Sequence, residues 1–364
     1  MTLQLISLLL TDGHEVTVVT RKSPRSPVFR QTINRELRLQ CFEIGGWDDQ
    51  ISPLSIHDGL AKQMWDSDRL APESLRFNLV TRTFYESHRF DLVVVSFIPD
   101  LALLATQDPI LLNVFGLPPN KEIALVERPL LERCRRMTFA SHYTKLSFLE
   151  LFGLEDNHDP GQVMHASVQM SFFECQSVGG KDFDACFVGR LTTRKGLYSI
   201  LEAVAWLKSQ QRNIALAVVG DGQERNALAT RAEQLGISEQ ITWFGALGSS
   251  EVARIIDRSR CFLSPALKPE AFACGNIEAM ARRVPVITTN LGGTTDYIWP
   301  EENALTCHPG CAESLALAIA RVLDNSELSE RLRANGFTTA QTFHPANAAS
   351  RWLRVFEETL RATS

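Results

Sequence analysis

The sequence Pro269-Glu-Ala-Phe-Ala-Cys-Gly-Asn-Ile-Glu-Ala-Met-Ala281 stands between two short apolar runs, residues 261–264 and 284–288. The two runs predict strands. Gly275-Asn276 predicts the start of a helix between them, with Asn276 as its N-cap. This region is therefore expected to pass from a strand through a loop and a helix to the next strand, as in an open α/β sheet.

Two carboxylates in this stretch, Glu270 and Glu278, are separated by seven residues. Glu270 would lie on the loop at the carboxyl end of a strand, and Glu278 inside the following helix. Open α/β sheets bind their ligands at that edge. Carboxylates placed there can accept hydrogen bonds from the hydroxyl groups of a sugar or a ribose.

Length and composition indicate a two-domain globular protein. A chain of 364 residues exceeds the usual size of one compact core. Hydrophobic residues make up 45% and charged residues 22%, and the net charge of −5 argues against a nucleic-acid-binding protein. Eight scattered cysteines without a CxxC pair are typical of reduced thiols in a cytoplasm.

No metal or cofactor is expected from the sequence. Cys307, His308 and Cys311 lie close together, but a fourth ligand is not nearby. Small residues around a turn are the favoured interpretation of this group.

The sequence shows no evident targeting or membrane-spanning segment. The early apolar run at residues 3–10 is far shorter than the ~20 residues of a span, and it predicts a helix instead. A basic stretch that follows could contact an anionic membrane surface, although a solvated loop and helix face is favoured. Its members are Arg21, Lys22, Arg25, Arg30, Arg35 and Arg38.

Strand-like and helix-like segments alternate along the chain, which indicates two doubly wound α/β halves. Strands are expected at residues 16–20, 39–44, 92–97, 110–115, 137–140, 185–188, 214–219, 241–244, 261–264, 284–288 and 304–307. A polar stretch at 176–182 resembles a linker, and an amphipathic helix is expected over 348–356. Two such halves predict a cleft that holds a donor on one side and an acceptor on the other.

Four polar groups follow strands of the second half, and the strand-end rule predicts that they converge. Arg190 and Lys195 offer positive charge for a diphosphate. Gly292-Gly293 would let backbone N–H groups approach an anion. Together with the carboxylate pair and the turn Gly220-Asp221-Gly222, they favour a nucleotide diphosphate that carries a polyhydroxyl group. Asp221 itself is interpreted as a turn residue.

This ordered set resembles the family-4 retaining glycosyltransferases of the GT-B fold. The similarity covers about residues 184–323. Its motifs in chain order are Phe187-Val-Gly-Arg-Leu with Lys195-Gly196, Val219-Gly-Asp-Gly222, Phe244-Gly245, Glu270-x7-Glu278-Ala-Met-Ala281, Pro285-Val-Ile, Gly292-Gly293 and Glu302-Asn303-Ala304.

The resemblance implies an α/β GT-B fold, with two Rossmann-like doubly wound parallel-sheet domains facing across a cleft. Residues 1–175 would form the acceptor domain and residues 176–340 the donor domain. A final helix over 341–364 would cross back to the N-terminal domain. The implied reaction is metal-independent transfer of a sugar, expected to be a hexose, from a nucleoside-diphosphate donor to an acceptor hydroxyl, with retention.

The resemblance also implies residue roles. Arg190 and Lys195 would hold the diphosphate, Glu278 the ribose hydroxyls, and Glu270 the sugar near its reacting end. Glu270, Arg190 and Lys195 are the expected catalytic groups. The other expected donor-binding residues are Phe244, Gly245, Phe272, Ala273, Cys274, Gly292 and Gly293.

The N-terminal half departs from the family pattern. Family members usually begin with a strand and a glycine-rich loop that would precede residue 1 of this sequence, and Phe115 stands where the family often has histidine. His142 is a candidate acceptor or sugar contact, and His165 replaces a frequent asparagine. A structural role is favoured for both histidines.

In the donor-binding loop, Ala273 takes a place that is often glycine, so its methyl group could narrow the sugar pocket. Cys274 is interpreted as a small packing residue rather than a reactive thiol.

Two alternatives to the transferase stay open. A catalytically silent nucleotide-sugar-binding or scaffolding protein would fit the changes in the N-terminal half. An epimerase or glycosyl phosphorylase of related fold ranks lower, because those proteins lack the full motif order.

Overall fold

A computed structural model describes residues 89–96, 106–116, 128, 131–154, 161–174 and 180–361, with the backbone of strands β1 (Val16–Arg21) and β2 (Leu39–Ile44). The chain forms two compact units. The first contains residues 1–140, 144–164 and 349–364, and the second contains residues 141–143 and 165–348. The helix expected at 3–10 and the side chains of the basic stretch lie outside the described residues.

The first unit is built on parallel strands. β1 pairs with β2, and a four-stranded sheet has the order β3-β4-β5-β6. The bounds in that sheet are β3 (Val93–Ser96), β4 (Ile110–Val114), β5 (Cys134–Phe139) and β6 (Gly161–Val163). β4 is buried along its whole length, as its uninterrupted apolar sequence predicts. The three-residue β6 was not predicted.

Two helices accompany this sheet, α6 (His142–Phe152) and α13 (Pro345–Arg361). Phe148 of α6 packs edge-on against Phe139 of β5, with ring centroids 5.3 Å apart. In α13, Trp352 and Phe356 are buried, which confirms the predicted apolar stripe of the C-terminal helix.

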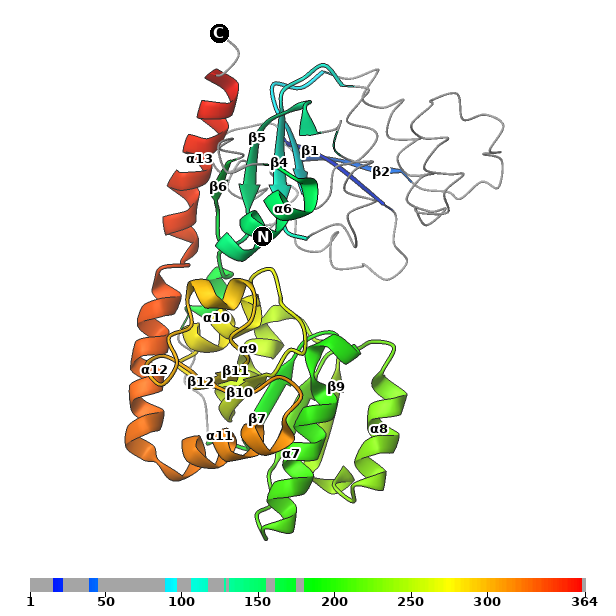
Figure 1. The fold of residues 1–364 in the computed structure, drawn as a ribbon, viewed down its shortest axis with the longest axis vertical. Coiled ribbons are helices and arrows are strands. Elements are labelled where there is room, and N and C mark those ends of the chain that lie inside the picture. The colour runs from blue at the N-terminus through cyan, green and yellow to red at the C-terminus, as the bar shows by residue number, and fades with distance from the viewer. Residues whose placement is uncertain are drawn as a thin grey trace, which may run out of the picture. The chain divides into compact units, whose positions relative to one another are not determined.

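The second unit contains one parallel sheet in the order β12-β11-β10-β7-β8-β9 (Figure 1). Its strands are β7 (Phe183–Val188), β8 (Leu216–Val219), β9 (Ile241–Gly245), β10 (Ser259–Ser264), β11 (Val286–Thr288) and β12 (Leu305–Thr306). Counted from β7, the order is that of a Rossmann sheet. The chain reverses its direction of progress across the sheet between β7 and β10, so the topological switch point lies there.

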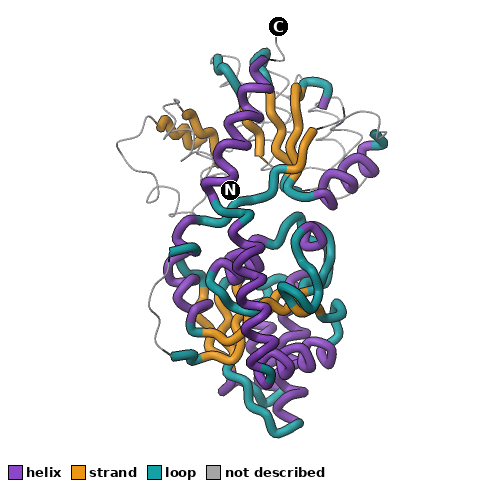
Figure 2. The backbone as a smooth tube through the Cα atoms, turned by 90° about the vertical axis from the view of Figure 1, so that its left-hand side faces the viewer, coloured by secondary structure: helices purple, strands orange, loops and turns teal. Residues whose placement is uncertain are grey.

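Helices cover both faces of this sheet (Figures 1 and 2). α7 and α11 pack on the face that carries Ala185, Phe187 and Leu263, while α9 and α10 contact β7, β10 and β11 from the other side. Neighbouring residues of a strand face opposite sides, so strands covered twice must be apolar throughout. The helix bounds are α7 (Leu197–Ser209), α8 (Arg225–Gln234), α9 (Ser249–Asp257), α10 (Cys274–Ala281), α11 (Ala312–Asp324) and α12 (Ser326–Gln341).

The predicted start of α10 was wrong. The N-cap is Ala273, and Asn276 lies inside the first turn, fully buried. Its side-chain amide donates to Thr288 Oγ1 and to Tyr297 Oη, each at 3.2 Å. Asparagine is therefore used here as a buried donor that ties the helix to β11, rather than as a cap.

Among the residues that the structure describes, none of the helices has the length and apolarity needed to cross a bilayer.

Candidate functional site

The turns after β7, β8 and β9 are hydrogen-bonded to one another at the carboxyl edge of the second unit's sheet. Gly189 N donates to Val219 O at 3.0 Å, and Leu191 N to Asp221 O at 3.0 Å. Gly220 N donates to Gly245 O at 2.7 Å. The turn residues singled out in the sequence therefore do converge.

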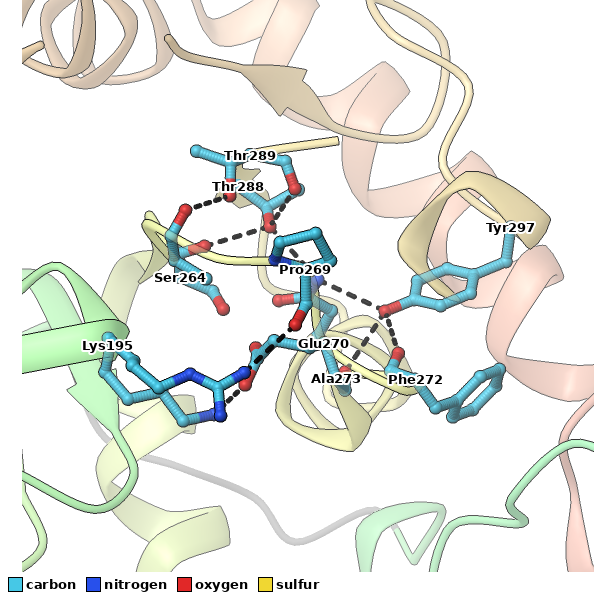
Figure 3. A network of polar contacts seen from close by, with 12 residues as sticks. Lys195, Ser264, Pro269, Glu270, Phe272, Ala273, Thr288, Thr289 and Tyr297 are labelled. Atoms are coloured by element: carbon cyan, nitrogen blue, oxygen red, sulfur yellow. Dashed lines mark hydrogen bonds and ion pairs between the residues drawn. The ribbon is translucent and has the colours of Figure 1, made fainter. Parts of the chain in front are cut away.

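Lys195 and Glu270 meet across the switch point. Lys195 ends the short 3₁₀ helix η4 (Thr193–Lys195) after β7, and Glu270 lies on the loop after β10. Lys195 Nζ forms an ion pair with Glu270 Oε1 (Figure 3). The side chains are 28% and 18% exposed, so the pair is accessible yet partly shielded from water.

The backbone fixes these two segments against each other. Leu267 N donates to Arg194 O at 2.8 Å, and Arg194 Nη2 donates to Pro269 O at 3.2 Å. Gly196 follows with φ of 76°, and a Cβ there would lie 1.9 Å from Pro265 O. Glycine is required at this position by both the conformation and the close approach.

Arg190 is exposed, and its side chain forms no hydrogen bond or ion pair within the described part of the chain. Within the described residues, Arg190 is thus an unpaired cation and Lys195 a paired one, both placed after the same strand.

Glu278 is half-buried in α10, and its carboxylate has no hydrogen-bond or ion-pair partner in the ranges that the structure covers. Burial raises the pKa of this carboxyl from 4.5 to about 7. A carboxyl with a raised pKa and no partner is typical of functional sites.

The Glu270 loop is held on one side by the loop after β11. Gly293 N donates to Glu270 O at 2.8 Å, and Glu270 forms an isolated parallel bridge with Gly292. A Cβ on Gly293 would lie 1.9 Å from Ala271 O, so no larger residue fits.

Tyr297 holds the other side of the loop and was not found from the sequence. Its buried hydroxyl lies 2.8 Å from Phe272 O and 3.1 Å from Ala273 O (Figure 3). Burial raises the pKa of Tyr297 well above its ordinary value, so the hydroxyl stays protonated and able to donate. Ala273 itself has φ of 59° and ψ of 60°, the left-handed conformation that glycine adopts without strain.

Phe244 is placed differently from its neighbour Gly245. Its ring packs edge-on against Phe183, with centroids 5.8 Å apart. Phe183 starts β7, at the opposite end of that strand from Arg190. Only Gly245 of this pair therefore joins the carboxyl-edge turns, through its carbonyl.

The described cysteines of the second unit form no disulfide. Cys274 is an exposed residue at the first position of α10. Cys311 caps α11, because its sulfur accepts from Ser314 N at 3.4 Å. Burial raises the pKa of Cys307 to about 12, and its thiol faces Thr288 O.

His142 and His165 converge on Asp296, which ends the 3₁₀ helix η6 (Gly293–Asp296). His142 Nδ1 lies 3.0 Å and His165 Nε2 lies 2.8 Å from Asp296 Oδ2. Burial acts to raise the pKa of Asp296, but the backbone N–H of His142 and the two imidazoles outweigh it, and the pKa is lowered. The sequence contained all three residues but no signal that they meet.

Residues 172–339 match the model of the family "Glycosyl transferases group 1". The chain resembles 2-deoxystreptamine glucosyltransferase of Streptomyces kanamyceticus, with 29% identity over 175 residues, 48% of this chain and 45% of the relative. Glycogen synthase of Mycobacterium tuberculosis is 26% identical over 145 residues, 40% and 35% of the two chains. The chain therefore spans less than half the length of these curated relatives.

Solved structures extend the likeness to the whole fold. Sucrose-phosphate synthase from Thermosynechococcus elongatus has a TM-score of 0.77 at 20% identity, covering 99% of this chain and 92% of that one. HepE from Anabaena, in complex with UDP and glucose, has a TM-score of 0.75 at 15% identity, covering 98% and 95%. The protein has the GT-B fold, with two Rossmann-like units built on parallel sheets.

Proposed function

We propose that the protein transfers a sugar, expected to be a hexose, from a nucleoside diphosphate to an acceptor hydroxyl, with retention of anomeric configuration and without a metal ion. The observation that carries the proposal is the Lys195–Glu270 pair across the switch point of a Rossmann sheet. Ligands of open α/β sheets bind at this point.

Arg190 and Lys195 are assigned to the diphosphate. Lys195 forms an ion pair with Glu270, so a diphosphate at this site would take over or share its charge. Arg190 is free to add a bidentate contact with phosphate oxygens.

Glu278 is assigned to the ribose. Hydroxyl groups that donate to a carboxylate stabilise its charged form and offset the cost of burial. A half-buried carboxylate that has no partner among the described residues therefore suits a ligand that supplies two neighbouring hydroxyls.

The sugar is assigned to Glu270 and to the loop that follows it. Phe272, Ala273 and Cys274 would border the sugar and the diphosphate on one side, and Gly292-Gly293 on the other. The base is assigned to the segment after Phe244, where Gly245 joins the edge.

The chemistry follows from the charges. Breaking the anomeric bond places negative charge on the leaving diphosphate and positive charge on the sugar ring. Arg190 and Lys195 would stabilise the negative charge on the diphosphate as preorganised cations. Loss of one such contact is expected to lower the rate by about 10²–10³. The leaving phosphate is expected to help take the acceptor's proton on the same face, which retains the configuration.

Incubation with UDP-, GDP- and ADP-sugars and a panel of small-molecule, lipid-linked and polysaccharide acceptors tests the proposal by release of nucleoside diphosphate. UDP-sugars come first, because HepE is similar in fold and was solved with UDP-glucose. Release that depends on acceptor, with an α-linked product from an α-linked donor and no loss in EDTA, is expected. An inverted product or a strict metal requirement would contradict the finer assignment. A cytoplasmic location and acceptor binding by the N-terminal domain remain predictions.

The second candidate is a nucleotide-sugar-binding protein without turnover. Phe115, half-buried directly after β4 where the family often has histidine, favours it. Tight donor binding with no acceptor-dependent release would support this candidate over the transferase.

A further inference from the structure

We propose that His142, His165 and Asp296 form a binding site for a divalent transition-metal ion of the zinc class. The three residues come from separate segments of the second unit and present one ligand atom each, all within 4.8 Å of one another. None of the three is assigned to the donor, although His165 stacks on Phe272 of the proposed donor loop.

The distances suit a shared ion. Zinc binds imidazole nitrogen and carboxylate oxygen at about 2.0–2.2 Å, which puts neighbouring tetrahedral ligands roughly 3.3 Å apart. Here the two ring nitrogens lie 3.0 and 2.8 Å from Asp296 Oδ2. The two ring nitrogens lie within 4.8 Å of each other, so an ion bound to both needs the imidazoles to move closer together by at most about 1.5 Å.

The hydrogen bonding around Asp296 also supports a metal ion at this site. Three nitrogens face the single oxygen Oδ2, since the backbone N–H of His142 also donates to it at 2.9 Å. One carboxylate oxygen has about two lone-pair sites. With a metal ion bound, the ring nitrogens act as lone-pair donors to the ion, and only the backbone N–H needs the oxygen.

The surroundings hold the ligands in place and leave a route to water. Asp296 is 5% and His165 20% exposed, and His165 stacks on Phe272 and meets the edge of Phe343. Packing of this kind fixes ring orientation. His142 is 70% exposed, so an ion can enter from its side.

The donor set selects the metal class. Two imidazoles with one carboxylate suit zinc and its neighbours, whereas magnesium and calcium prefer oxygen ligands. Three protein ligands leave a fourth position for water. The ion would tie residues 141–143 and His165 to the end of η6, whose first residue, Gly293, is bonded to Glu270.

The test is zinc binding by the metal-free full chain, measured by competition with a chromophoric chelator. The ligand variants are His142→Gln, His165→Asn and Asp296→Asn. His308→Ala and Cys311→Ser are matched controls, because they remove potential ligands elsewhere in the same unit. Circular dichroism checks the fold of each variant, and His142→Gln changes the most exposed ligand.

We expect one zinc ion per chain in the wild type and in the controls. Each ligand variant should bind zinc at least about 100-fold more weakly, because loss of even an outer-shell partner can weaken binding by up to that factor. Cobalt should give the visible absorption of a tetrahedral site in the wild type and not in His165→Asn. Absence of binding, unchanged affinity in the ligand variants, or loss in Cys311→Ser instead would each overturn the proposal. None of these readouts depends on glycosyl transfer.

Discussion

Lys195 and Glu270 form an ion pair at the switch point, so each offsets the charge of the other. The family resemblance assigned them to different parts of the ligand. If Lys195 holds the diphosphate as proposed, Glu270 competes with that diphosphate for the same ammonium group. Removing the charge of Lys195 should therefore weaken nucleotide binding, whereas removing the charge of Glu270 should not.

Lys195→Met should weaken binding of the preferred nucleoside diphosphate by roughly 10- to 100-fold. The reason is the loss of a charged hydrogen bond, which contributes about 1.5–3 kcal/mol. Glu270→Gln should bind the nucleoside diphosphate at least as tightly as the wild type, because Lys195 is released, while turnover falls. Calorimetric titration gives both affinities. Lys208→Met, an exposed lysine of the same unit, is the control and should bind normally. Weaker binding in Glu270→Gln would contradict the competition.

Glu278 should make nucleotide binding depend on pH. Its pKa of about 7 in the ligand-free protein lies above the ordinary 4.5, and ribose hydroxyls favour the charged form. The complex then binds fewer protons than the free protein, so affinity rises with pH by about tenfold between pH 6 and 8. Titrations at several pH values measure this.

Glu278→Gln separates this effect from titration of the diphosphate itself. The variant keeps the part of the pH dependence that belongs to the ligand and loses the rest. The same raised pKa implies a fold stability that declines as pH rises from 4.5 to 7, because the native state holds a proton that the unfolded state has lost. If nucleotide affinity has the same pH profile in the wild type and in Glu278→Gln, Glu278 does not bind the ribose.

At the scale of the element, the start of α10 shows how the donor loop is built. Ala273 occupies a left-handed conformation as the N-cap, where the family often has glycine. Such a residue costs about 1–3 kcal/mol in strain. Tyr297 bonds to the carbonyls of Phe272 and Ala273 and so keeps the loop in this conformation.

Ala273→Gly removes this strain, but the freer unfolded chain offsets about 0.4–1 kcal/mol of the gain. The free energy of unfolding should therefore rise by about 1 kcal/mol. Urea denaturation measures the change. Gln211→Gly is the matched control, since Gln211 has φ of 62° just after α7. Both should gain stability, and only Ala273→Gly should alter donor affinity. A loss of stability in Ala273→Gly would contradict the strain.

The elements of the second unit were predictable because its strands are buried on both faces and read as short apolar runs. β8 and β11 began two residues later than predicted, which is usual for strand ends. Asn276 was misassigned as a cap because its local sequence signal is the same in both roles. Only the tertiary partners Thr288 and Tyr297 distinguish a buried donor from a helix cap.

Contacts that join distant segments could not be predicted. Asp296 lies far from His142 and His165 in the sequence, and nothing local marks their convergence. The same holds for the packing of Phe244 on Phe183, two residues from different strands. Lys195 and Glu270 were both predicted site residues, but their ion pair required the Rossmann strand order.

At the scale of the whole molecule, one parallel sheet in Rossmann order explains why all donor assignments fall on one edge. The strands share a direction, so the loops after β7, β8, β9, β10 and β11 collect at the same end. A ligand that contacts several of these loops at once should stabilise the native state. Stabilisation by a ligand grows with its concentration, reaching about 2.7 kcal/mol at 100 times the Kd.

The most direct measurement is calorimetric titration of the full chain with UDP, GDP, ADP and their sugar conjugates, in wild type, Lys195→Met and Glu278→Gln. One nucleotide series should bind the wild type with one site per chain, and both variants should bind it more weakly at pH 8. Wild-type protein that binds none of the series, or binding that both variants retain in full, would contradict a donor site at this edge.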